Sequence, residues 1–329
     1  MRRRDFITFV GGAAVWPLAA RAQQNDRIPH VGVLAGYSAS NPLGQMLSTV
    51  LGHGLAASGW RDGENLRVDW RWTGGDAELY ERYAAELVAL GPEVLLAQTS
   101  LAVRALRRQT KTIPIVFVIV TDPVGQGFVT SLAHPGGNVT GFSDYDPPIA
   151  GKWVELLTEI MPPVGRIAVL YNPVSTPFAS QILQAVEAAA PRFAVTAQAA
   201  PCRDDGDIDS AMAELARKER AGALIVPEVF TAVHRDAIVA AAAKHRVPAI
   251  YANRISSTRS ELITYGVDPE DLFRDAAVYV DRLLRGANPT DLPVQNPTKF
   301  LLTINLGTFK SLGLTIQPTL LATANEVIE

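Results

Sequence analysis

An uninterrupted apolar run, Ile113–Val120, is rich in isoleucine and valine. An apolar run of this length without polar alternation predicts a strand that is buried on both faces. It ends at Thr121 and Asp122, after which we expect a short helical piece, 126–132, and an extended segment, 139–143. In an open α/β sheet, ligands bind beyond the carboxyl ends of the strands, so Thr121 and Asp122 lie where a ligand would bind.

Strands and amphipathic helices alternate on both sides of this stretch. In the first half of the chain the pattern predicts strands at 29–34, 65–72 and 94–97, and helices at 43–58, 76–90 and 101–109. The second half repeats the order, with strands at 166–171, 193–199, 223–226 and 247–251, and helices at 178–190, 207–217 and 232–245. Such a repeat predicts the α/β class, with two doubly wound parallel-sheet lobes.

Further elements follow the second repeat, and they require the chain to return to the first lobe. We expect a strand at 262–267, a helix that starts at Asp268, a strand at 300–304 and a helix at 306–312. Three crossovers are expected, near Gly141, Thr264 and Pro297. They assign 28–141 and 264–297 to an N-terminal lobe, and 142–263 and 298–329 to a C-terminal lobe.

The first 22 residues have the pattern of an export signal rather than of the fold. A basic start is followed by an apolar stretch, 6–20, that is short for a membrane span, and by a small-x-small cleavage pattern at Ala20-Arg21-Ala22. Arg3-Arg4-Asp5-Phe6-Ile7 also resembles the twin-arginine export motif. No cysteine stands directly after the cleavage site, so a lipid anchor is not expected. We predict a soluble periplasmic protein.

Composition excludes several classes of function. The net charge of −3 becomes more negative when the basic signal is removed, and an acidic protein is a poor candidate for binding nucleic acid. A single cysteine, Cys202, and five scattered histidines provide neither a disulfide framework nor the spacing of a metal site. The letters of a dinucleotide fingerprint at Gly52–Ala57 fall within a predicted helix, and phosphate-loop and nucleophile-elbow motifs are missing. We therefore expect no cofactor.

Polar and aromatic residues recur at the predicted strand ends, which would meet at one cleft between the lobes. Thr99 and Ser100 combine hydroxyl groups with free N–H groups at a helix start, which suits a carboxylate, although an ordinary N-cap would give the same pattern. Asp122 and Glu228 would be buried acids, whose partner could be a ligand ammonium or equally an arginine or a helix N–H. The complete predicted binding set is Tyr37, Ser38, Thr99, Ser100, Thr121, Asp122, Phe142, Asn172, Glu228, Tyr251 and Asp268.

Some members of this set also fit purely structural roles. Asp268 precedes a proline and fits a plain helix N-cap. Tyr37, Phe142 and Tyr251, together with Tyr265, could form an aromatic wall, but each of them alone is more often a core residue than a ligand contact.

Several stretches of the chain resemble one known family. They are the twin-arginine start with Ala20–Gln24, Ile113–Phe117 with Asp122-Pro123, Pro135–Asn138 with Thr140-Gly141, Pro248–Tyr251, Tyr265-Gly266, and Leu292–Phe300 through Asn305 with Gly313-Leu314. With them, the chain resembles the substrate-binding proteins of ABC transporters typified by the tryptophan-binding lipoproteins, although it lacks their lipidation cysteine. The resemblance implies a type I periplasmic binding protein with a ligand closed between two lobes, and a membrane permease and an ATPase as partners.

The expected function is therefore the binding component of an importer and not an enzyme. The ligand would be a small carboxylate, first an aromatic or branched-chain amino acid and next an aromatic acid. The lobes would hinge at the crossovers and close on the ligand, and the protein would act as a monomer. Two alternatives share these features: an exported racemase or hydrolase that uses Asp122 or Glu228 as acid-base, and a ligand sensor for a chemoreceptor.

Overall fold

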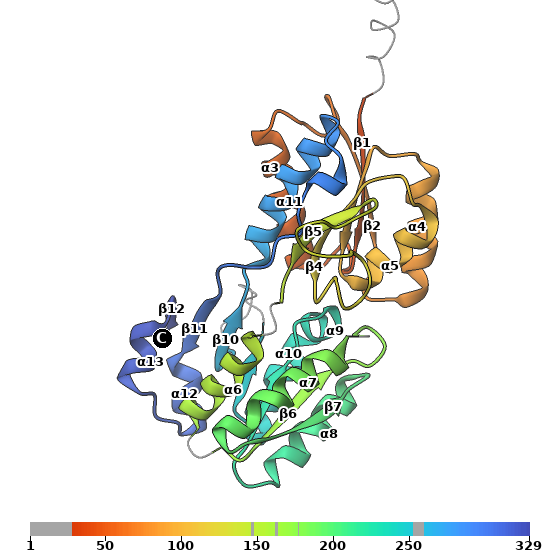
Figure 1. Cartoon of the computed structure of the whole chain (residues 1–329). Helices are drawn as coiled ribbons and strands as arrows, with labels where there is room; N and C mark the ends of the chain where they lie inside the picture. The colour runs from red at the N-terminus through yellow and green to blue at the C-terminus, as the bar shows by residue number, and fades with distance from the viewer. Residues whose placement is uncertain (1–27, 146–147, 162–163, 177, 253–259) are drawn as a thin grey trace, which may run out of the picture.

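The structure is a computed structural model that describes residues 28–145, 148–161, 164–176, 178–252 and 260–329. The predicted export signal lies outside these residues. The described chain forms two α/β lobes, each built around its own sheet (Figure 1). The predicted fold class is confirmed. No helix in the described part of the chain is long and apolar enough to cross a membrane.

The first lobe contains a five-stranded parallel sheet in the order β2-β1-β3-β4-β5. Helices α3 and α11 cover one face, and α4 and α5 cover the other (Figure 1). The apolar run predicted as a strand buried on both faces forms β4, with every residue of β4 except Ile119 buried. The elements are β1 (His30–Ala35), α3 (Pro42–Ala57), β2 (Arg67–Trp72), α4 (Ala77–Ala89), β3 (Val94–Gln98), α5 (Ser100–Gln109), β4 (Ile115–Val120), β5 (Val139–Ser143) and α11 (Pro269–Leu284).

The second lobe contains a seven-stranded sheet in the order β12-β11-β10-β9-β8-β6-β7, in which only the β10–β11 pair is antiparallel. Its strands are β6 (Arg166–Tyr171), β7 (Thr196–Pro201), β8 (Ala221–Ile225), β9 (Ala249–Tyr251), β10 (Ile263–Gly266), β11 (Leu301–Asn305) and β12 (Glu326–Ile328). Its helices are α6 (Ile149–Ile160), α7 (Ala179–Ala189), α8 (Asp205–Ala216), α9 (Val229–Val233), α10 (Arg235–His245), α12 (Leu306–Leu312) and α13 (Pro318–Thr323).

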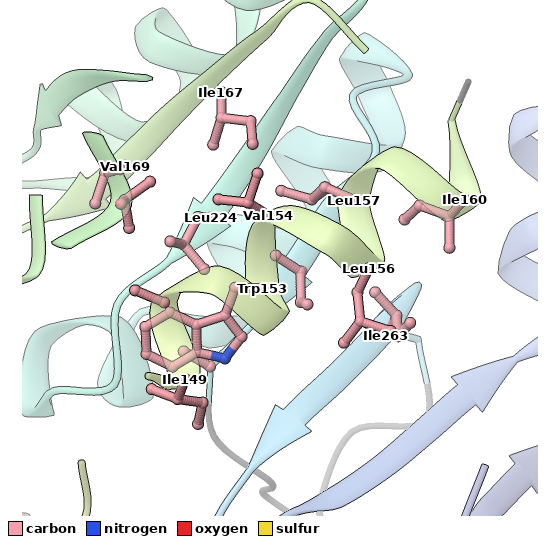
Figure 2. Close-up of a cluster of buried hydrophobic side chains, with 14 of the residues drawn as sticks. Ile149, Trp153, Val154, Leu156, Leu157, Ile160, Ile167, Val169, Leu224 and Ile263 are labelled. Carbon is pink, nitrogen blue, oxygen red and sulfur yellow. The ribbon is translucent and has the colours of Figure 1, made fainter. Parts of the chain in front are cut away.

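Helix α6, which the sequence analysis did not predict, provides much of the core of the second lobe. Figure 2 shows its apolar side chains, among them Trp153 and Leu157, packed toward Ile167 and Leu224 of the sheet. The indole N–H of Trp153 donates to the carbonyl oxygen of Tyr265 at 2.8 Å, so the helix is also fixed to β10. Apolar residues at helical spacing over 149–160 are the signal that could have predicted this helix.

The chain passes between the two sheets at three places. It leaves the first sheet after β5, returns between β10 and α11, and crosses again before β11. At the last crossing the backbone of Gln295 still pairs with β5, since Gln295 N donates to Gly141 O at 2.9 Å and Ser143 N donates to Gln295 O at 2.9 Å. The first and last connections therefore lie side by side, although the exact limits predicted for the lobes stay a prediction.

Three local predictions were wrong or incomplete. The segment 126–132 forms a series of turns rather than a helical piece, because the Asp122 carboxylate accepts from Gly125 N at 2.8 Å and Gly127 has a φ of 69°. The helix expected over 232–245 is two helices, α9 and α10, which are separated at His234. The last two elements, α13 and β12, were not predicted; β12 pairs with β11 at the edge of the sheet.

Candidate ligand-binding cavity

A cavity lies where the strand ends of the first lobe face the second lobe. Residues of both lobes line it. The first lobe contributes Tyr37, Leu43, Gly75, Tyr80, Gln98, Thr99, Ser100, Leu101 and Ile119, and the start of α11 adds Val267 and Pro269. Asp144 comes from the first crossover, and Ser175, Phe178, Pro227, Glu228 and Val229 come from the second lobe.

The N-terminus of α5 presents hydrogen-bond donors to this cavity. Thr99, its N-cap, has a φ of 89°, an unfavourable value for a β-branched residue that is held by its N–H bond to Val118 O at 3.0 Å. In the described residues, the backbone N–H groups of Ser100 and Leu101 have no acceptor. Free N–H groups at the positive end of a ten-residue helix suit an anion.

A chain of hydrogen bonds joins this helix start to a buried acid. The Gln126 amide nitrogen donates to Ser100 Oγ at 2.9 Å and to the carbonyl oxygen of Thr121 at 2.5 Å. The Thr121 hydroxyl in turn donates to Asp144 Oδ1 at 2.9 Å. Because Ser100 Oγ already accepts from Gln126, its own proton remains available to a ligand.

Asp144 is the acid in the cavity with the fewest partners. It is 6% exposed, and burial raises the pKa of its carboxyl to about 6, although the hydrogen bond from Thr121 opposes that rise. None of the described residues that line the cavity is basic. A buried carboxylate without a cation is costly, so this position favours a positively charged ligand group.

Glu228, by contrast, is already satisfied within the second lobe. Its carboxylate accepts from Ser175 Oγ at 2.7 Å, from Phe230 N at 2.8 Å, and from the N–H groups of Asn172 and Thr231 at 3.3 Å each. Burial raises the pKa of Glu228, and these donors oppose the rise. Glu228 caps α9. The partner of this buried acid, which the sequence left open between a ligand ammonium, an arginine and a helix N–H, is therefore the start of a helix.

Of the predicted binding residues, the structure brings four to the cavity: Tyr37, Thr99, Ser100 and Glu228. Thr121 lies directly behind them and holds Asp144.

Three other predicted residues in the first lobe and at the crossovers lie outside the cavity. Ser38 is in an exposed loop, with its hydroxyl 3.4 Å from that of Ser40. The Asp122 carboxylate is used by its own turn at Gly125. Phe142 packs against Tyr279, with ring centroids 4.6 Å apart.

The remaining three predicted residues serve the local structure. The Asn172 side chain accepts from Val174 N at 2.8 Å and holds the loop after β6. Tyr251 is buried in the second lobe, 5.2 Å from the guanidinium of Arg235. Asp268 caps α11 and accepts from Glu270 N at 3.0 Å. It therefore has the plain N-cap role that its position before a proline favoured.

The sequence analysis missed several residues of the cavity, above all Gln98, Asp144 and Tyr80. Asp144 directly follows β5, just as Asp122 follows the neighbouring β4, so the same strand-end rule could have included it. Gln98 is the last residue of β3 and precedes the predicted Thr99. Tyr80 lies on the buried face of α4, where spacing alone predicts core packing.

The two lobes touch at the cavity through a valine and two glycines. A Cβ placed on Gly36 would lie 2.9 Å from Val229 Cγ2 and 2.7 Å from the Tyr80 hydroxyl oxygen, and one on Gly75 would lie 3.5 Å from Val229 Cγ1. Val229 belongs to α9 of the second lobe, so the absence of side chains at these glycines allows the lobes to approach.

Comparison with known proteins gives relatives over most of the chain. The family described as ABC transporter substrate binding protein matches residues 45–328. A tyrosine-binding protein of Clostridioides difficile is 28% identical over 261 residues, which cover 79% of this chain and 74% of that protein.

Solved structures agree with this family. A Vibrio cholerae conserved domain protein is 30% identical, with a TM-score of 0.84, and a Streptococcus pneumoniae ABC domain in complex with L-Trp is 25% identical, also with a TM-score of 0.84. Each alignment covers 92% of this chain and 100% of the other. With two lobes around one cavity and a family match over residues 45–328, the chain belongs to the ABC transporter substrate-binding protein family.

Proposed function

We propose that this protein binds the zwitterion of an α-amino acid in the cavity between its lobes. The hydrogen-bonded series Ser100–Gln126–Thr121–Asp144 carries the proposal, because it holds a group of free donors and a buried carboxylate in one framework. The ligand carboxylate takes the hydroxyl of Ser100 and the N–H groups at the start of α5. The ligand ammonium takes Asp144, which the sequence analysis had not selected.

The rest of the cavity supports an apolar or aromatic ligand side chain. Leu43, Phe178, Val229 and Val267 line it, and Tyr37 and Tyr80 add aromatic surface. Two relatives support an aromatic ligand side chain, since one is named for tyrosine binding and another was crystallised with L-tryptophan.

The role we propose in the cell is delivery of this amino acid to an ABC importer outside the cytoplasmic membrane. The ligand contacts both lobes, so it stabilises the closed form over the open one, with movement at the three crossovers. A permease and an ATPase then take up the ligand. The protein works as a monomer and releases its ligand chemically unchanged.

Ligand analogues test the zwitterion directly by isothermal titration calorimetry. L-Tyrosine should bind, whereas 3-(4-hydroxyphenyl)propionate, which lacks the ammonium, and tyramine, which lacks the carboxylate, should each bind at least about 30-fold more weakly, since each leaves a buried charged or donor group unpaired. In Asp144→Asn the propionate should bind about as tightly as L-tyrosine, whereas tyramine should still bind more weakly than L-tyrosine. Equal affinity of the wild type for L-tyrosine and the propionate would refute the role of Asp144, and chromatography of the recovered ligand tests for chemical change.

A further inference from the structure

One buried polar group of the cavity remains unused by the proposed zwitterion site. Gln98 is 2% exposed, and its Oε1 accepts from Gly36 N at 3.0 Å. This bond fixes the orientation of the amide, because only the oxygen can accept. Nε2 is therefore a donor, and the described residues offer it no acceptor. Gln98 nevertheless lines the cavity.

The position of Gln98 separates it from the carboxylate site. Along β3, Val94 and Leu96 pack with the α3 and α11 side of the sheet, whereas Leu95 and Ala97 pack with the α4 and α5 side. Side chains alternate along a strand, so Gln98 belongs to the α3 and α11 side. Helix α5, whose start carries the free N–H groups, packs on the opposite face of the sheet.

The cavity on the Gln98 side is otherwise apolar. Tyr37, Leu43 and Val267 belong to the hydrophobic cluster of α3 and α11, and Ile119 packs against it. A buried amide donor without a partner is costly in such surroundings, and a ligand atom that accepts its hydrogen bond removes the cost. A ligand held at the start of α5 and at Asp144 would extend its side chain into this region.

We infer that Gln98 is a specificity-determining residue that selects an amino acid whose side chain ends in a hydrogen-bond acceptor, and that the preferred ligand is tyrosine. The inference rests on the proposed amino-acid site. The phenolic oxygen of tyrosine accepts from Gln98 Nε2. Phenylalanine provides no acceptor, and the indole N–H of tryptophan is a donor only. Both amino acids therefore leave Gln98 Nε2 without an acceptor. A site built to bond a hydroxyl rejects the analogue that lacks it.

Calorimetry with L-tyrosine, L-phenylalanine and L-tryptophan tests this inference on the wild type and on Gln98→Met. The wild type should prefer L-tyrosine over the other two by about 10- to 100-fold. Gln98→Met removes the donor at similar volume, and it also removes the acceptor of Gly36 N, a loss that all three ligands share. The preference for L-tyrosine over L-phenylalanine should therefore fall to within about threefold. Gln181→Met is the matched control, since Gln181 also has an unpaired buried amide atom but does not line the cavity, and it should keep the wild-type preference.

Three results would overturn the inference. A wild type that binds L-phenylalanine or L-tryptophan as tightly as L-tyrosine contradicts it without any variant, so it remains testable if Gln98→Met does not fold. An unchanged preference for L-tyrosine in Gln98→Met would mean that Gln98 does not select the side chain of the ligand. Failure of every amino acid to bind would refute the proposed function itself, and the inference with it.

Discussion

The two acids of the cavity have similar burial but opposite surroundings. Asp144, at the first crossover, receives one side-chain hydrogen bond, from Thr121, whereas Glu228, in the second lobe, receives four bonds from its own lobe. The same contrast holds for the two faces of the cavity. The first-lobe face leaves the donors of Ser100, Leu101 and Gln98 without acceptors among the described residues, while Glu228 and its neighbours satisfy one another.

This difference indicates that the first lobe provides the unpaired polar groups of the cavity and the second lobe mainly apolar surface. Unpaired polar groups are costly in a folded protein, so their concentration on one face indicates where a ligand makes its polar contacts. In the second lobe the cavity acid Glu228 is satisfied by its own lobe, which also contributes apolar surface such as Phe178 and Val229. We propose that this apolar surface covers the ligand on closure.

The largest effect is expected from removing the charge of each acid in turn. Asp144→Asn should weaken amino-acid binding by about 2–5 kcal/mol, because the ligand ammonium loses its buried partner. Glu228→Gln should change binding by less than about 1 kcal/mol but destabilise the fold by about 1–3 kcal/mol, because a charge-assisted helix cap is lost. Calorimetry and thermal unfolding of both variants separate the two effects. Equal losses of affinity would contradict the comparison.

The contact between the lobes is tested at Gly36. Gly36→Ala places a Cβ 2.9 Å from Val229 Cγ2 and 2.7 Å from the Tyr80 hydroxyl oxygen, so closure requires a shift that should weaken binding by about 1–3 kcal/mol. Val229→Ala in the same chain should restore part of the affinity. Gly52→Ala is the control, since a Cβ there meets nothing within 4 Å in α3, and it should leave binding unchanged. Small-angle scattering with and without ligand would report the closure itself.

The pH dependence of binding follows from the raised pKa of Asp144, about 6. The ammonium needs the ionised carboxylate, so affinity should fall by about tenfold between pH 7 and pH 5 as Asp144 becomes protonated. In the free protein the raised pKa acts in the opposite direction, because this carboxyl's contribution to stability decreases as pH rises from its ordinary pKa of 3.8 to about 6. Asp144→Asn should flatten both profiles, and calorimetry over this range checks them. A wild-type affinity that rises toward pH 5 would contradict the assignment.

The smallest effect concerns the orientation of one hydroxyl. Ser100→Ala and Gln126→Met should each weaken binding by about 1–2 kcal/mol, and the double variant by little more than either, because Gln126 acts by directing the Ser100 proton toward the ligand. A double-mutant cycle from calorimetry measures this coupling. Additive losses would mean that Gln126 acts independently of Ser100.

The elements of the fold were largely predictable from local pattern. The β4 run, the alternation of strands and helices, and the N-cap at Asp268 are consequences of residue order over short distances. The predictions failed where a side chain overrode the pattern, as when the Asp122 carboxylate formed a turn with Gly125 in place of a helical piece. Helix α6 was missed although its apolar spacing was visible in the sequence.

The chain's own residue pattern was enough to predict the α/β class, which the structure confirms, and also two lobes and an edge of the sheets at which a ligand would bind, because periodicity and strand ends are local properties. It could not decide which acid at that edge lacks partners. Asp122, Asp144 and Glu228 all follow strands, and only the folded structure brings four donors to Glu228 and a turn amide to Asp122. Among the described residues, it brings no basic side chain to the cavity beside Asp144. Hydrogen-bond partners and burial come from segments distant in sequence, so the chemistry of this site depends on tertiary contacts.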